Sequence, residues 1–219
     1  MNLEEAVASF AKELEDLIFG VLGRPAVFKA ELDSSRTQPR VSISNADLNG
    51  IAISIQGRLA FRLQLSYLCE MHPSTSRLTI INSTYKVVLP VSGGPLWHYD
   101  YVRDMKKASS AIAHLNVYAH RNEIVGAMAL SKRFDKKLNI QTLHFPFGGP
   151  RFRPTLEDVF EMLITEFSID KAHGAMNKLK KSRAIYFERQ LESAVRDSPE
   201  IAAQSLRLLG YEVNSPSLL

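Results

Sequence analysis

The sequence predicts an α+β fold: a mainly antiparallel sheet of six or more strands, preceded by an N-terminal helix and followed by a C-terminal block of three helices. Apolar residues repeat at helical spacing at the start of the chain and in its last third. The stretch between them consists of short segments rich in β-branched and aromatic residues. Strands followed by a block of helices are typical of a segregated α+β fold, not of an alternating α/β fold.

Residues 2–20 predict the first helix. Asn2 is a suitable N-cap, and Glu5 lies three residues further on, where it can complete a capping box. Gly20 or Gly23 is expected to end the helix. The residues expected to face the core are Leu3, Val7, Phe10, Leu14, Leu17 and Ile18.

Five segments between residues 25 and 89 predict strands: AVFKAEL, RVSISN, IAISIQ, RLAFRLQLSYLC and RLTIINSTYKVVL. In the fourth, Phe61, Leu63, Leu65 and Tyr67 alternate with polar residues, which is typical of a half-buried antiparallel strand. Three more strands are expected between residues 96 and 154, within WHYDYVRD, AHLNVYAHR and LHFPFGGPRFRP.

Three helices are predicted in the last third of the chain. Residues 156–167 carry a continuous apolar stripe, with Thr155 as N-cap and Asp158 as its capping partner. A long helix is expected from about Ala175 to Val195, and a last one from Ser198 to Gly210, with a short strand or packing segment at 211–213. We predict one domain over residues 1–213 and a flexible tail over residues 214–219.

The composition of the 219 residues fits a globular protein with a substantial core, because 45% are hydrophobic and 23% are charged. The single cysteine, Cys69, excludes an internal disulfide, and no metal or cofactor motif is present. The acidic, amphipathic N-terminus does not resemble a signal peptide. No apolar run reaches the ~18 residues that span a bilayer. We therefore expect a cytoplasmic protein without a membrane partner, and homo-oligomerisation stays open.

The net charge of +4 comes entirely from residues 96–219, which hold 18 Lys and Arg against 14 Asp and Glu. Such a basic half permits contacts with nucleic acid or with an acidic protein. The candidate anion-binding residues are Arg151, Arg153, Lys178, Lys181 and Arg183. Lys178 and Lys181 are both expected to be exposed.

Four of the six histidines lie between residues 96 and 154. Because side chains alternate along a strand, neighbouring strands can gather several of these histidines and Asp100 on one sheet face. A polar, solvent-facing sheet face with aromatic residues opposite is the favoured interpretation. The alternative is acid–base chemistry, for which the candidate catalytic residues are His114, His98, His144 and Asp100.

Two hypotheses of function follow. The favoured one is a non-catalytic binding protein that uses its basic C-terminal half to contact nucleic acid or an acidic protein, with a bacterial stress or defence system as its hypothesised setting. The alternative is a histidine-dependent phosphodiesterase or ribonuclease that uses the histidine face. No P-loop, Rossmann, GxSxG or HExxH motif is present, so the sequence leaves open whether the protein is an enzyme.

Overall fold

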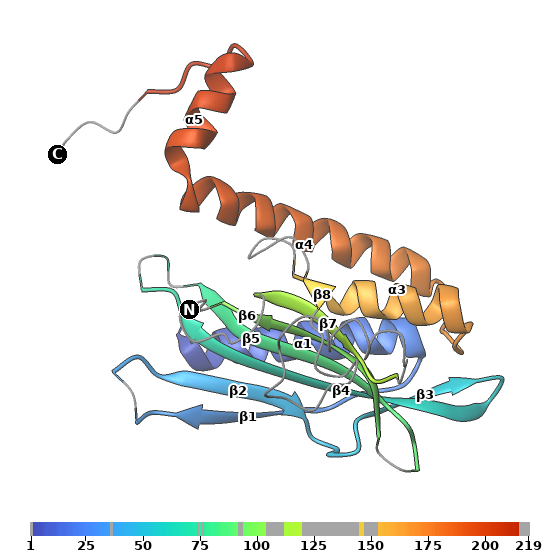
Figure 1. Ribbon diagram of the computed structural model, residues 1–219. Helices are drawn as coiled ribbons and strands as arrows, with labels where there is room; N and C mark the ends of the chain where they lie inside the picture. The colour runs from blue at the N-terminus through green and yellow to red at the C-terminus, as the bar shows by residue number, and fades with distance from the viewer. Residues whose placement is uncertain are drawn as a thin grey trace, which may run out of the picture. The chain divides into compact units, whose positions relative to one another are not determined.

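The computed structural model describes residues 2–35, 37–73, 75, 77–91, 94–103, 112–119, 145–146 and 153–214. These residues contain an N-terminal helix, eight strands and three C-terminal helices (Figure 1). The chain divides into two compact units, residues 1–179 and residues 180–219. The single domain over residues 1–213 stays a prediction, and residues 215–219 of the predicted tail lie outside the described residues.

Helix α1 (Leu3–Leu22) begins and ends where its local signals predict. The Glu5 amide donates to Asn2 Oδ1 at 2.8 Å, and the Asn2 amide donates to Glu5 Oε2 at 3.0 Å, so the predicted capping box is confirmed. Gly23 ends the helix with a left-handed backbone (φ 68°), which glycine adopts without strain. Of the two predicted stop positions, Gly23 is therefore the one used.

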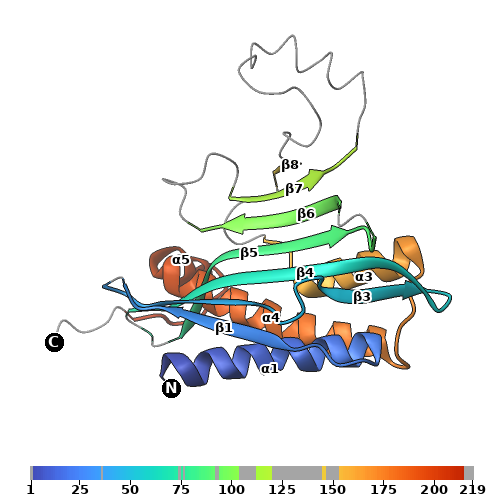
Figure 2. The same ribbon diagram turned by 90° about the horizontal axis from the view of Figure 1, so that it is seen from below.

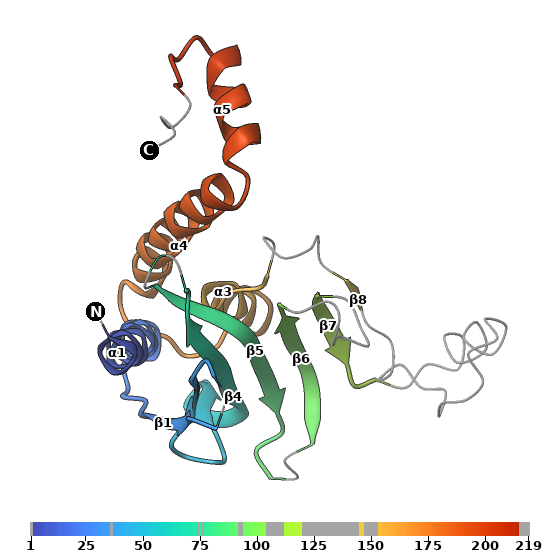
Figure 3. The ribbon, with the colours of Figure 1, turned by 90° about the vertical axis from the view of Figure 1, so that its left-hand side faces the viewer.

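The strands form one antiparallel sheet in the order β1-β2-β4-β5-β6-β7-β8, and β3 also pairs with β4 (Figures 2 and 3). Every described pairing is antiparallel, which confirms the predicted α+β fold class. The strands are β1 (Phe28–Asp33), β2 (Arg40–Asn45), β3 (Ile51–Ile55), β4 (Arg58–Met71), β5 (Leu78–Val88), β6 (Pro95–Val102), β7 (Ala113–Val117) and β8 (Phe145–Pro146).

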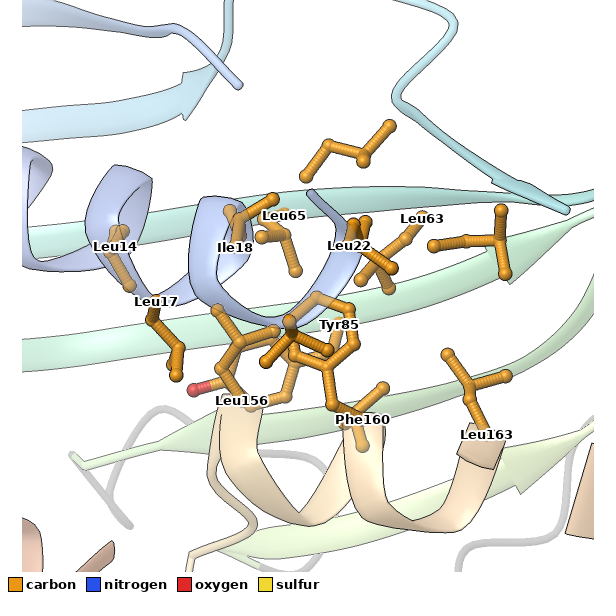
Figure 4. Close-up of a cluster of buried hydrophobic side chains, with 14 of the residues drawn as sticks. Leu14, Leu17, Ile18, Leu22, Leu63, Leu65, Tyr85, Leu156, Phe160 and Leu163 are labelled. Carbon is orange, nitrogen blue, oxygen red and sulfur yellow. The ribbon is translucent and has the colours of Figure 1, made fainter. Parts of the chain in front are cut away.

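The core of the first unit lies between one face of the sheet and helices α1 and α3 (Leu156–Phe167). Figure 4 shows Ile18 of α1 and Phe160 of α3 beside Leu63 and Leu65 of β4. All four side chains are buried, as is Tyr67, so the predicted alternation of β4 is confirmed. The opposite face of the sheet carries polar residues of β4, β5 and β6, among them Gln64, Thr84 and His98.

The predicted helix at residues 156–167 is confirmed at both ends. Thr155 and Asp158 form its capping box, with the Asp158 amide 3.1 Å from Thr155 Oγ1. The helices α4 (Ala175–Asp197) and α5 (Pro199–Leu208) follow, which confirms the three-helix block. Residues 211–213 are described but form no strand, and Tyr211 is exposed. No helix of the described chain is long and apolar enough to cross a membrane.

An aspartate after α3 fixes the tight turn between β3 and β4. Asp170 accepts hydrogen bonds from the backbone amides of Gln56 (2.8 Å) and Gly57 (2.7 Å), and its own amide donates to the Ser54 carbonyl (2.8 Å). Gln56 and Gly57 both have positive φ, as a tight hairpin turn requires. Asp170 therefore ties the hairpin to the segment that leaves α3.

Candidate functional site

The pairing of β5, β6 and β7 places the candidate site residues opposite one another. Asp100 pairs with Thr84 on one side and with His114 on the other, while His98 pairs with Asn116. Residues directly opposite each other point to the same face of a sheet. This face is opposite to the core face, because Tyr85, which alternates with Thr84, packs in the core.

A single carboxylate joins the polar residues of this face. Asp100 Oδ2 lies 3.0 Å from His98 Nε2 and 3.6 Å from His114 Nε2. The Thr84 hydroxyl donates to the other oxygen, Asp100 Oδ1, at 2.7 Å. The ring of Tyr118 packs beside that of His98, with 5.5 Å between the ring centroids. We refer to Thr84, His98, Asp100 and His114 as the histidine cluster.

The histidine cluster does not lie on an open surface. His114 and Asn116 are each only 3% exposed, and His98 and Asp100 are half-buried. The interpretation of a solvent-facing polar sheet face is therefore wrong at this end of the sheet. Strand alternation assigns a side chain to a face, but it contains no information about what covers that face.

The surroundings of Asp100 favour its charged form. Burial raises the pKa of this carboxyl group, but hydrogen bonds from His98 and Thr84 and electrostatic interactions with His98 and His114 outweigh burial, so its pKa is lowered. For Tyr118, burial and then the charge of Asp100 raise the pKa of the phenol. The cluster is thus organised around an ionised carboxylate.

His98 has one ring nitrogen on the carboxylate and one that is unused. Nε2 contacts Asp100, whereas Nδ1 is buried and has no hydrogen-bond partner among the residues that the structure describes. An imidazole that a carboxylate holds by one nitrogen can exchange a proton through the other. His98 and His114 thus contact the same carboxylate.

Two residues predicted for this region, His144 and Arg151, lie outside the described residues. A third, Arg153, lies away from the histidine cluster. The Arg153 guanidinium lies over the ring of Tyr101, 5.5 Å from its centroid. Tyr101 neighbours Asp100 in β6 and so points to the opposite face of the sheet. The structure therefore does not bring Arg153 to the histidine cluster.

The predicted anion-binding residues of α4 differ in exposure. Lys181 is exposed, whereas Lys178 and Arg183 are half-buried. The stem of Lys178 packs over α1, since a Cβ on Gly20 would lie 2.7 Å from Lys178 Cγ. The expectation that Lys178 is exposed is therefore wrong, because long basic side chains bury their methylene stems readily.

The second unit exposes large apolar side chains and buries none of its described residues. Its described residues, 180–214, include no buried side chain. The same residues expose many large hydrophobic side chains: Ile185, Phe187, Leu191, Val195, Ile201, Leu206, Leu208, Leu209 and Tyr211. The basic residues Lys180 and Lys181 are also exposed, on helix α4.

Other groups that could carry chemistry are limited in the described part of the chain. No set of three or more His, Cys, Asp and Glu residues there is arranged to hold a metal ion. Cys69 is buried on the core face, and burial raises the pKa of its thiol to about 12, which keeps the thiol protonated and unreactive.

Sequence reasoning missed Thr84, although it donates the shortest hydrogen bond to Asp100. The only signal was its position among the polar residues of β5. No family model matches the chain, and no similar curated protein or solved structure was found. The residues and their geometry are thus the basis for a functional proposal.

Proposed function

We propose that this chain is a binding protein that contacts an anionic partner through the basic part of helix α4 that belongs to its second unit. The observation that supports this most directly is the absence of any buried side chain among residues 180–214, together with their exposed apolar residues. Helices of this length owe most of their stability to burying an apolar face. Contiguous apolar surface that stays exposed is typical of interaction sites.

The charge pattern supports an anionic partner. Residues 171–187 contain five Lys and Arg residues and no Asp or Glu. Two of the five, Lys180 and Lys181, are exposed on α4. A concentration of positive charge on one exposed segment accelerates and strengthens the association with acidic surfaces or phosphates.

The test is to measure binding of the full chain to a labelled single-stranded RNA and to a labelled glutamate-rich peptide at low and moderate salt. Both interactions should weaken as salt rises, because cations compete for the charged groups. The double variant Lys180→Glu, Lys181→Glu should weaken them at least tenfold. Arg58→Glu, at an exposed position of the first unit, is the matched control. Binding of neither probe would reject the proposal.

A second function, hydrolysis of a phosphodiester bond, is favoured by one specific observation. The Asp100 carboxylate contacts both His98 and His114. In such a reaction one imidazole takes the proton of the attacking hydroxyl group, and the other gives a proton to the leaving oxygen. Asp100 would hold both rings in place and stabilise the charged one.

This second function is tested on single-stranded RNA and DNA, with and without a divalent metal. His98→Gln and His114→Gln should abolish cleavage, and the same substitution at His144 tests a residue that the structure does not place. His173→Gln, an exposed residue outside the cluster, should cleave like wild type. Activity should fall at both low and high pH, because one catalytic group must be neutral and the other charged. If wild type cuts neither substrate, the histidine cluster is structural.

A further inference from the structure

Three of the exposed apolar residues of α4 follow helical spacing, whereas Ile185, which is 51% exposed, lies on another side of the helix. Phe187, Leu191 and Val195 are each four residues apart and therefore lie along one side of the helix. They are 60%, 50% and 54% exposed. Ala184, three residues before Phe187, extends the same line. We call these four residues the α4 stripe.

The α4 stripe continues into basic residues. Lys180 lies seven residues, or two helical turns, before Phe187 and so on the same side of the helix. Lys181 and Arg183 lie on either side of this line. One side of α4 thus presents positive charge at its N-terminal part and apolar side chains further along.

This combination distinguishes between classes of partner. A nucleic acid would neutralise Lys180 and Lys181 but would leave Phe187, Leu191 and Val195 in water, because phosphate contacts dominate such interfaces. An amphipathic helix with acidic residues near one end would cover both parts, since its apolar face pairs with the stripe.

A second copy of the chain fits the surface less well. Two α4 helices packed in parallel would bring Lys180 and Lys181 beside the same residues of the other copy, and like charges repel. In an antiparallel pair centred on Leu191, α4 continues only to Asp197, six residues away, whereas Arg183 and Lys180 lie eight and eleven residues before Leu191. Lys180 and Arg183 would then lie beyond Asp197, the last residue of the other α4 helix.

We propose that the α4 stripe docks an acidic amphipathic helix of a partner protein, an inference that rests on the proposed binding function and specifies its partner. The apolar side chains would supply the buried centre of the interface, where most binding energy arises. Lys180 and Lys181 would supply orientation and the rate of association.

The experiment measures binding of the full chain to three labelled probes. The first is a designed helical peptide with leucines on one face and glutamates on the other, the second has the same composition in scrambled order, and the third is a single-stranded RNA. The first peptide should bind at least tenfold more tightly than the scrambled one. Leu191→Ser and the double variant Lys180→Glu, Lys181→Glu should each weaken that binding at least tenfold.

Two controls match these variants in chemistry and exposure. Leu48→Ser replaces an exposed leucine of the first unit, and Arg58→Glu reverses an exposed charge there. Both should bind the helical peptide like wild type. Circular dichroism of every variant, with helix content equal to wild type, ensures that lost binding is not lost folding.

Three results would overturn the inference. The first is RNA binding that Leu191→Ser leaves unchanged, together with equal binding of the helical and scrambled peptides. The partner would then be anionic, as proposed, but it would be a nucleic acid. A dimer in sedimentation experiments that Leu191→Ser dissociates and the peptide does not displace would make the occupant a second copy. Binding of no probe at all would reject both the inference and the proposed function on which it rests.

Discussion

Replacing Phe160 with alanine should strongly destabilise the first unit. Phe160 lies in the middle of α3 with none of its surface exposed, and Figure 4 shows it among Leu156, Leu163 and Tyr85. It is the largest of the fully buried side chains in the described chain. The substitution leaves the helix intact, because alanine has the highest helix propensity. Its effect is therefore a measure of core packing.

The loss of stability can be estimated from the apolar area that Phe160 buries and from the cavity that alanine leaves. A buried aromatic side chain removes roughly 150–250 Å² from water, at about 25 cal/mol per Å². Alanine retains only part of that contribution, and the cavity left between α3 and the sheet adds a further cost. We expect the free energy of unfolding to fall by ~3–5 kcal/mol. For a protein of this size the melting temperature should fall by roughly 6–20 °C.

The assay is denaturation by urea and by heat, followed by circular dichroism, with Phe187→Ala as the control. Phe187 is 60% exposed on α4, so the same chemical change there should alter the free energy of unfolding by no more than ~0.5 kcal/mol. If Phe160→Ala lost less than ~1 kcal/mol, or no more than Phe187→Ala, the placement of α3 over the sheet would be wrong.

Three further predictions concern polar groups of the first unit. Asp170→Ala should lower the free energy of unfolding by ~1–2 kcal/mol in urea denaturation because the Gln56 and Gly57 amides lose their acceptor, whereas Glu166→Ala, at an exposed site, should not. Because the pKa of Asp100 is lowered, its carboxylate stabilises the fold above pH 3.8, the ordinary pKa of the group, and this stabilisation is lost as the pH falls below that value. The free energy of unfolding should therefore decrease more steeply with falling pH in wild type than in Asp100→Asn. Native protein should react with a thiol reagent only as fast as it unfolds, because burial raises the pKa of Cys69 to about 12; rapid labelling without unfolding would contradict this.

The features that the sequence predicts best are those that depend on neighbouring residues. The capping boxes at Asn2 and Thr155 each involve a partner three residues away, and both helices begin where these signals place them. The alternation of β4 depends only on the period of a strand. The long helix α4 was predicted to end at Val195, two residues before its end at Asp197, because a charged helix without a glycine stop has no sharp local boundary.

The features that the sequence could not predict depend on distant residues. The contacts of Asp100 with Thr84 and His114 require the registers of β5, β6 and β7, which alternation alone leaves undetermined. The packing of Lys178 over Gly20 joins helices from opposite ends of the chain. Whether a polar residue is exposed, as expected for the histidine face, is likewise decided by segments elsewhere in the sequence.

The histidine cluster and the α4 stripe can be tested separately. Neither arrangement of side chains is one that the stability of the fold alone would favour. Breaking a buried ionic group is costly, but replacing the whole group with apolar residues is often neutral or stabilising, so stability does not require Asp100 and its histidines. Nδ1 of His98 is buried and has no hydrogen-bond partner within the described part of the chain, an arrangement that typically costs ~1–3 kcal/mol. Phe187 and Leu191 are 60% and 50% exposed, so each leaves at least half of its side chain unburied. Leu191→Ser should therefore affect binding without altering the cluster, and His98→Gln should affect any turnover without altering the stripe.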